Sequence, residues 1–181
     1  MPLRSQDSND RVMVFIDLAN IEMKAHDLRF SVDYCELVKN VVRTRKMVAS
    51  YVFDSHGEDG CDSFIQSRLR RNGFRMHIRD SYDTNREEQK EVDVAMACNI
   101  VAHAFRDNYD VAVIVSGDRD YVPAIEMVQD LGKRVEVASF RGCIGTAMMN
   151  AGDQFIDMDT LPILKMDCIL TDLSEVIEWS A

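Results

Sequence analysis

Apolar and polar positions alternate along this chain in blocks that are typical of strands followed by helices. Short apolar runs rich in β-branched Val and Ile predict strands, several of them buried on both faces. Between these runs, apolar positions repeat at helical spacing. The predicted strands are 12–16, 47–53, 74–78, 111–115 and 134–140. The predicted helices are 33–44, 61–72, 91–106, 123–131 and 144–151.

The connecting segments are polar and predict loops. A polar turn follows the first strand, residues 54–60 are rich in Gly and Asp, and 81–91 is highly charged with no apolar face, which predicts a mobile loop. Strands that alternate with helices of this length are parallel and joined by right-handed crossovers. The pattern therefore predicts a single-domain α/β protein, a three-layer α/β/α sandwich around a mainly parallel sheet.

Three parts of the chain differ in composition. Residues 1–10 form a polar tail without the apolar core of a signal peptide. Residues 11–160 hold the strand–helix pattern, and 161–181 form an acidic extension. The extension has a short amphipathic stripe at Leu173, Val176 and Ile177. We expect a short helix there that packs on its own domain or, alternatively, on a partner subunit in a homodimer.

Composition narrows the class of protein. An apolar content of 46% with 29% charged residues is that of a soluble globular protein, and no apolar run approaches the roughly 20 residues of a membrane span. The chain has five widely spaced cysteines: Cys35, Cys61, Cys98, Cys143 and Cys168. Because no two of them form a C-x-x-C pair, the sequence argues against a zinc site and predicts reduced thiols in a cytoplasmic protein.

Charge is unevenly distributed. The net charge is −10, and 157–181 alone holds six acids against one lysine. By contrast, five arginines fall within twelve residues: Arg68, Arg70, Arg71, Arg75 and Arg79. Such a cluster can present a local basic surface to a nucleic acid even on an acidic protein. A solvated helix face with its exit loop is the simpler interpretation.

The most informative stretch is the turn after the strand 111–115. There the chain reads Ser116-Gly117-Asp118-Arg119-Asp120. The carboxyl end of a buried parallel strand is where open α/β folds place their ligands. One of the two acids can cap the following helix. The second acid then has no structural explanation, so the turn is a candidate cation site.

Two further acids have the same character. Asp17 directly follows the strand 12–16, so it meets Asp118 if the two strands are neighbours. Asn20 either turns toward the same cleft or, more simply, caps the next helix. Asp93 falls near the middle of a helical arc whose other members are apolar: Val94, Met96, Ala97, Ile100, Val101, Ala104 and Phe105. A carboxylate in a core is costly unless something satisfies it; the alternative is a helix-start acid favoured by the helix dipole.

Electrostatics indicates what such a cluster would bind. Two like charges about 4 Å apart repel by roughly 4 kcal/mol at an effective dielectric constant near 20. A divalent cation removes that repulsion, and hard oxygen ligands suit Mg²⁺ or Mn²⁺. The candidate metal-binding and catalytic residues are Asp17, Asp93, Asp118 and Asp120. Bound metal that orients a water is the arrangement of phosphodiester hydrolysis.

Three motifs together resemble the NYN domain family. They are Phe15-Ile16-Asp17-x-x-Asn20, Lys90-x-x-Asp93, and Val115-Ser116-Gly117-Asp118-x-Asp120-Tyr121-x-Pro123 followed by Leu131-Gly132-Lys133. They are most similar to the bacterial LabA-like branch (DUF88) of the PIN-like nuclease superfamily. The resemblance implies a PIN-like, Rossmann-like sheet and an Mg²⁺- or Mn²⁺-dependent ribonuclease. It assigns the four aspartates to the metal and makes Asn20 and Ser116 supporting groups. Asn99 departs from the pattern, because related sequences often have a further acid there.

On this hypothesis Asp17 and Asp118 bind the metal directly, while Asp93 and Asp120 complete the coordination or hold its water. The partner is RNA, single-stranded or structured, and no membrane is involved. The residues expected to hold its phosphates are Arg68, Arg70, Arg71, Arg75, Arg86 and Lys90. Two alternatives stay open. One is a non-catalytic RNA-binding or regulatory module with a degenerate acidic pocket. The other is a phosphoacceptor or phosphatase-like domain, which the order of the acids fits less well.

Overall fold

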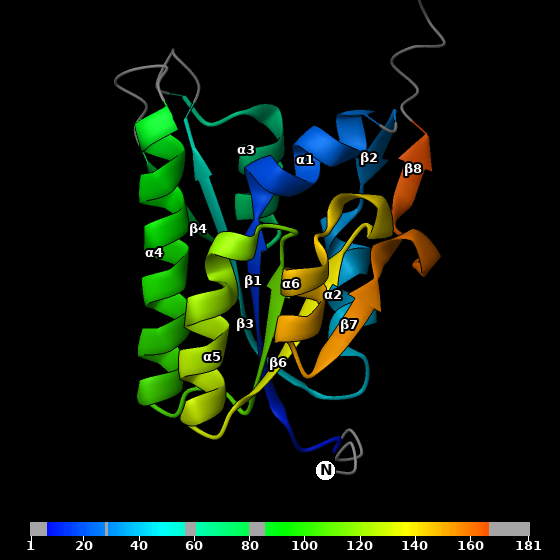
Figure 1. Cartoon of the computed structure of the whole chain (residues 1–181). Coiled ribbons are helices and arrows are strands. Elements are labelled where there is room, and N and C mark those ends of the chain that lie inside the picture. Colours follow the sequence, from blue (N-terminus) through cyan, green and yellow to red (C-terminus); the bar gives the residue numbers. More distant parts are fainter. Residues whose placement is uncertain (1–6, 28, 57–60, 80–85, 167–181) are drawn as a thin grey trace, which may run out of the picture.

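A six-stranded, entirely parallel sheet runs through the centre of the molecule, with helices on both faces (Figure 1). The computed structural model describes residues 7–27, 29–56, 61–79 and 86–166, with the backbone alone for 86–89 and 166. The strand order is β4-β3-β1-β5-β6-β7. The strands are β1 (Arg11–Asp17), β3 (Lys46–Ser55), β4 (Arg75–Arg79), β5 (Val111–Val115), β6 (Arg134–Ser139) and β7 (Gln154–Asp157).

Alternate residues of each strand supply two separate cores, one on each face of the sheet. On one face, Val14 and Ile16 of β1 pack with α1 (Leu18–Asp27), α2 (Tyr34–Val42) and α3 (Phe64–Arg71). On the other, Met13 and Phe15 pack with α4 (Arg86–Phe105), α5 (Val122–Asp130) and α6 (Thr146–Ala151). The predicted three-layer α/β/α sandwich is therefore confirmed.

Four elements were not predicted from the pattern: α1, β2, β7 and β8. α1 replaces the expected polar turn after β1, and its buried residues are limited to Leu18, Ile21 and Ala25. β7 adds a sixth strand to the five that were predicted. A separate two-stranded sheet joins β2 (Phe30–Val32) to β8 (Leu164–Met166) in antiparallel register. β8 lies in the stretch that composition assigned to the extension, whose amphipathic stripe falls outside the described residues.

Helix α4 departs from the sequence prediction in two ways. It begins at Arg86, so the loop expected through residue 91 is wrong over 86–91; Glu, Gln and Lys are good helix formers and extend the helix beyond its packed part. The wide apolar arc is also wrong, because Val94 is 61% and Phe105 79% exposed. The buried stripe is narrow and follows every fourth residue: Val92, Met96, Ile100 and Ala104. Asp93 thus lies on the flank of this stripe.

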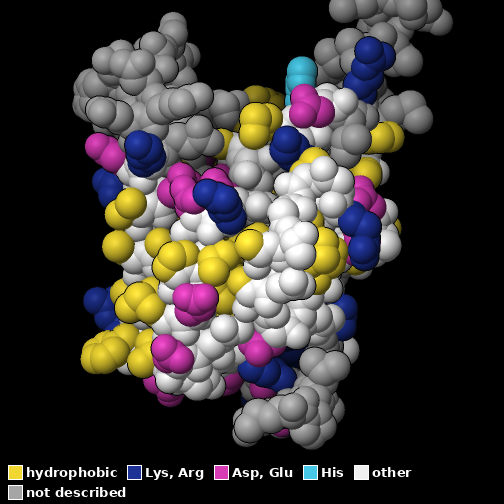
Figure 2. All heavy atoms as spheres, viewed as in Figure 1, with side chains coloured by type: hydrophobic (Ala, Val, Ile, Leu, Met, Phe, Trp, Pro, Cys, Tyr) yellow, Lys and Arg dark blue, Asp and Glu magenta, His cyan; other side chains and the backbone are white. Residues whose placement is uncertain are grey.

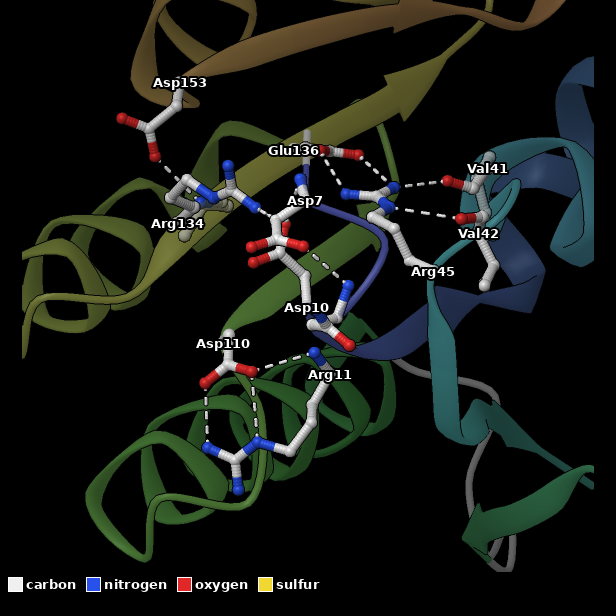
Figure 3. Close-up of polar contacts among 12 residues, drawn as sticks. Asp7, Asp10, Arg11, Val41, Val42, Arg45, Asp110, Arg134, Glu136 and Asp153 are labelled. Atoms are coloured by element: carbon white, nitrogen blue, oxygen red, sulfur yellow. Dashed lines mark hydrogen bonds and ion pairs between the residues drawn. The ribbon is translucent and has the colours of Figure 1, made fainter. Parts of the chain in front are cut away.

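A buried ion pair lies at the end of the sheet where the strands begin (Figure 3). Arg45, before β3, bonds through Nη1 and Nη2 to Oε1 and Oε2 of Glu136 on β6, at 2.6 and 2.9 Å. The same guanidinium donates to the carbonyl oxygens of Val41 and Val42 at the end of α2. Both side chains are at most 6% exposed. This network joins α2, β3 and β6.

No helix among residues 7–27, 29–56, 61–79 and 86–166 has both the length and the apolar character that a membrane crossing requires.

Candidate active site

Asp17 is the last residue of β1 and is only 4% exposed. Its Oδ1 accepts the backbone N–H of Asn20 at 3.1 Å. Its Oδ2 accepts the hydroxyl of Ser116 at 3.0 Å, and the hydroxyl of Tyr121 lies 3.3 Å away. β1 and β5 are neighbours, as the sequence hypothesis required, which brings Ser116 beside Asp17 from the end of the adjacent strand.

Tyr121 connects Asp17 to Asp93. Its hydroxyl lies 2.9 Å from Oδ1 of Asp93 and 3.3 Å from Oδ2 of Asp17, and its side chain is fully buried. A phenol has one proton to donate, so two ionised carboxylates share a single donor. The third sequence motif contains Tyr121, but no role was predicted for it. The available signal was its position directly after Asp-x-Asp, in the first turn of a helix that packs on the sheet.

Asp118 and Asp120 lie in the turn after β5. Oδ1 of Asp118 accepts the N–H of Asp120 at 2.9 Å and so caps the short 3₁₀ helix η1 (Arg119–Tyr121), which α5 continues. The N–H of Asp118 donates to Oγ of Ser116 at 3.1 Å. Asp120 is exposed. Figure 2 shows acidic side chains together on the surface between the upper end of α4 and the start of α5.

Asn20 does not cap a helix, which corrects the simpler expectation. It lies in the first turn of α1, where the carboxylate of Asp17 takes the capping role. Oδ1 of Asn20 instead accepts the N–H of Gly117 at 3.0 Å and ties α1 to the Ser-Gly-Asp turn. A Cβ at Gly117 would lie 2.8 Å from the carbonyl oxygen of Cys143, so this tight turn requires glycine.

Burial is the main cause of the raised pKa values of Asp17 and Asp93. Burial, with a contribution from Asp93, raises the pKa of Asp17 from 3.8 to about 6, against the opposing effect of its hydrogen bonds. Burial also raises the pKa of Asp93, and so do the charges of Asp118 and Asp120. Asp93 lies about two turns after the start of α4. It is too far along the helix to be a helix-start acid, so that structural explanation is wrong.

The arrangement is not a preformed cage for a metal. Within the part of the chain that the structure describes, no three His, Cys, Asp or Glu side chains are placed to hold one ion together. Asp17 and Asp93 meet through Tyr121, and Asp118 and Asp120 act on Asp93 through their charge. Mg²⁺ needs only one or two carboxylates when waters and phosphates complete its shell. The donor set therefore fits such an ion, while the four-aspartate ligand set stays a prediction.

The basic residues expected to bind RNA fall on different surfaces. Arg68, Arg70 and Arg71 lie on α3, which packs on the opposite face of the sheet from α4. Arg70 there pairs with Asp62 at 2.9 Å. Arg75 and Lys90 lie on β4 and α4, on the same face as the acids. The side chain of Arg86 lies outside the described residues.

Two of the proteins that are similar to this chain have no assigned activity. An uncharacterized protein of Methanocaldococcus jannaschii is 35% identical over 66 residues, which is 36% of this chain and 28% of that protein's length. The crystal structure of a protein of unknown function from Vibrio parahaemolyticus matches with a TM-score of 0.73 at 19% identity. It covers 89% of this chain and 99% of its own. At that identity the likeness shows a shared fold.

The family assignment is firmer. The model of the NYN domain matches residues 11–162, which include every strand of the central sheet and all four candidate acids. NYN domains are part of the PIN-like nuclease superfamily, whose members generally depend on divalent metals. The chain thus belongs to the NYN domain family.

Proposed function

We propose that this protein is an Mg²⁺- or Mn²⁺-dependent ribonuclease that hydrolyses RNA phosphodiester bonds at the edge of the sheet where β1 and β5 end. The observation that supports this most is the buried carboxylate of Asp17, which shares the Tyr121 hydroxyl with Asp93. Burial raises the pKa of Asp17 more than its hydrogen bonds lower it, so the residues around Asp17 do not fully compensate its negative charge. Members of the PIN-like nuclease superfamily generally depend on divalent metals, and such an ion would compensate this charge.

Asp17 and Asp118 would hold the ion, with Asp93 and Asp120 completing its shell or holding its water. A bound ion would lower the pKa of that water and polarise the phosphate. The surrounding residues orient the carboxylates. Ser116 donates to Asp17 and accepts the N–H of Asp118, so one hydroxyl fixes both acids relative to each other. The Tyr121 hydroxyl lies between Asp17 and Asp93 and has one proton to share between the two carboxylates.

The Asp17→Asn variant should be more stable than the parent when metal is absent. A carboxyl group whose folded-state pKa is raised stabilises the fold at low pH, and that stability is lost as the pH rises through about 6. The rise from 3.8 to about 6 corresponds to on the order of 3 kcal/mol. In EDTA at pH 7.5 we expect Asn at this position to raise the free energy of unfolding by about 1–3 kcal/mol.

Urea unfolding of both proteins at pH 4 and pH 7.5, with EDTA or Mn²⁺, measures this. The advantage of the variant should vanish at pH 4, and Mn²⁺ should stabilise the parent but not the variant. Equal stabilisation of both proteins by Mn²⁺ would show that the ion binds elsewhere. Cleavage of a labelled single-stranded RNA by the parent in Mn²⁺, and its loss in EDTA, tests the hydrolytic activity itself.

A non-catalytic RNA-binding module is the second candidate. The observation in its favour is that no three candidate ligands converge on one point among the described residues. It predicts RNA binding by the parent in EDTA and no cleavage with Mg²⁺ or Mn²⁺. The metal-dependent stabilisation of the parent distinguishes the two, because a degenerate pocket has no ion to gain.

A further inference from the structure

The edge strand β4 presents three cationic or aromatic side chains in a row. Arg75, His77 and Arg79 are exposed, whereas Met76 and Ile78 between them are half-buried. Alternate residues of a strand point to the same face and lie about 6.7 Å apart. The face is that of α4, because His77 stacks on Phe53, which belongs to the core under that helix. Since β4 is the last strand of the sheet, this row lies open at the edge of the molecule.

His77 is held as a rigid platform. Its ring stacks on Phe53 with 4.9 Å between centroids and 14° between planes, and the ring of Tyr51 lies 5.4 Å away. Phe53 is fully buried while His77 is exposed, so a flat ring is fixed from below and accessible from outside. Arg75 is fixed as well, because its Nη1 donates to the Tyr51 hydroxyl at 2.7 Å.

A groove runs beside this row, along the outer flank of α4. Its volume is about 540 Å³, and its walls include Arg79, Lys90, Val94, Cys98 and Asn99. Glu91 is an acidic side chain on the same wall. Two cations, one from β4 and one from α4, thus lie across an apolar floor in a protein whose net charge is −10.

The groove adjoins the acidic site. Asp17, Phe53 and His77 are register partners on three adjacent strands, β1, β3 and β4. At the usual strand spacing the Cα atoms of Asp17 and His77 are about 10 Å apart. α4 packs over β1, β3 and β4, and Lys90, which lines the groove, is three residues before Asp93 on this helix, so the two lie on neighbouring positions of its surface.

We propose that Arg75, His77, Arg79 and Lys90, here named the β4 strip, bind a single-stranded RNA segment that continues over α4 to the acidic site. That the bound nucleic acid is RNA rests on the proposed ribonuclease function. Arg79 and Lys90 contact phosphates, and a base stacks on His77. Cationic side chains that follow the backbone and an aromatic ring that takes a base are how proteins bind single strands. A duplex keeps its bases stacked inside, so it cannot use His77.

Fluorescence anisotropy with a labelled 12-nucleotide single-stranded RNA, in EDTA to prevent cleavage, tests this directly. Loss of a stacked base costs about 1–3 kcal/mol, so His77→Ala should weaken binding about fivefold or more, and His77→Phe should restore it. The Arg79→Ala/Lys90→Ala double variant should also reduce the slope of log K against log salt by about 1.4. The matched control is Lys46→Ala, which removes an exposed cation at the start of β3, at the other end of the sheet, and should leave binding within about twofold.

Thermal unfolding of each variant confirms that the fold is kept. The proposal is overturned if the double variant binds like Lys46→Ala, if His77→Phe is as weak as His77→Ala, or if a duplex of the same sequence binds as tightly. Cleavage by Mn²⁺-loaded protein separates this proposal from the function itself. If the parent cuts RNA but the strip variants bind RNA normally, the ribonuclease proposal stands and the proposed binding by the β4 strip is wrong. If RNA binds through the β4 strip but is not cut, only the ribonuclease proposal is wrong.

Discussion

Asp17→Asn should reduce Mn²⁺-dependent RNA cleavage by about 10²–10³-fold, the usual effect of removing one group that stabilises transition-state charge. Asparagine keeps the shape of the side chain and can still accept the N–H of Asn20. The variant therefore removes charge from a folded site. Ser116→Ala should have a smaller effect, about 10–100-fold, because Ser116 acts by orienting Asp17 and Asp118.

Initial rates on a labelled single-stranded RNA, at saturating Mn²⁺, measure both effects. Asp130→Asn provides the matched control, since Asp130 is an exposed acid at the end of α5, and it should cut like the parent. Cleavage by Asp17→Asn at the parental rate would mean that the activity comes from a contaminant. The loss of cleavage rate should be largest for Asp17→Asn, smaller for Ser116→Ala and absent for Asp130→Asn. This order distinguishes an effect at the site from a general loss of negative charge.

Glu136→Gln should destabilise the protein by about 3–5 kcal/mol, because it leaves the Arg45 guanidinium buried without a counter-charge. Figure 3 shows this guanidinium between Glu136 and the last carbonyls of α2. Exposed pairs contribute about 0–1 kcal/mol. The comparison variant Glu36→Gln, which breaks the exposed Glu36–Lys39 pair, should therefore have little effect.

Urea unfolding monitored by circular dichroism measures the two losses. Replacing both partners with apolar residues, as in Arg45→Met/Glu136→Leu, should recover most of the stability, because the uncompensated charge is then gone. If Glu136→Gln lowered the free energy of unfolding no more than Glu36→Gln does, the buried pair would not be holding α2 against the sheet. The pair lies at the edge opposite the acids, so the stability lost there is independent of the metal.

The sequence predicted the part of the site that depends on strand ends. Asp17 and Ser116 follow buried strands, and in a doubly wound sheet two such ends meet wherever the strands are neighbours. Helical geometry also singled out Asp93, although it placed that residue in the middle of the buried face. A helical wheel gives direction but not the width of the stripe that packs, and here the stripe is one residue per turn.

Contacts between distant elements could not be predicted in this way. The Tyr121 hydroxyl reaches Asp93, 28 residues earlier in the chain, and Arg45 reaches Glu136 across 91 residues. Neither pair leaves a periodic signal in the sequence. α1 was missed for a related reason, because only three of its residues are buried and most of the others are polar.

An anomalous difference map from crystals soaked in Mn²⁺ tests the central claim most directly, since it locates the ion without reference to activity. We expect one peak within coordination distance, about 2.0–2.2 Å, of a carboxylate oxygen of Asp17, with Asp118 or Asp93 as a second ligand. Saturating Mn²⁺ with no peak at Asp17, or with a peak only at other acids of the surface, would contradict the account.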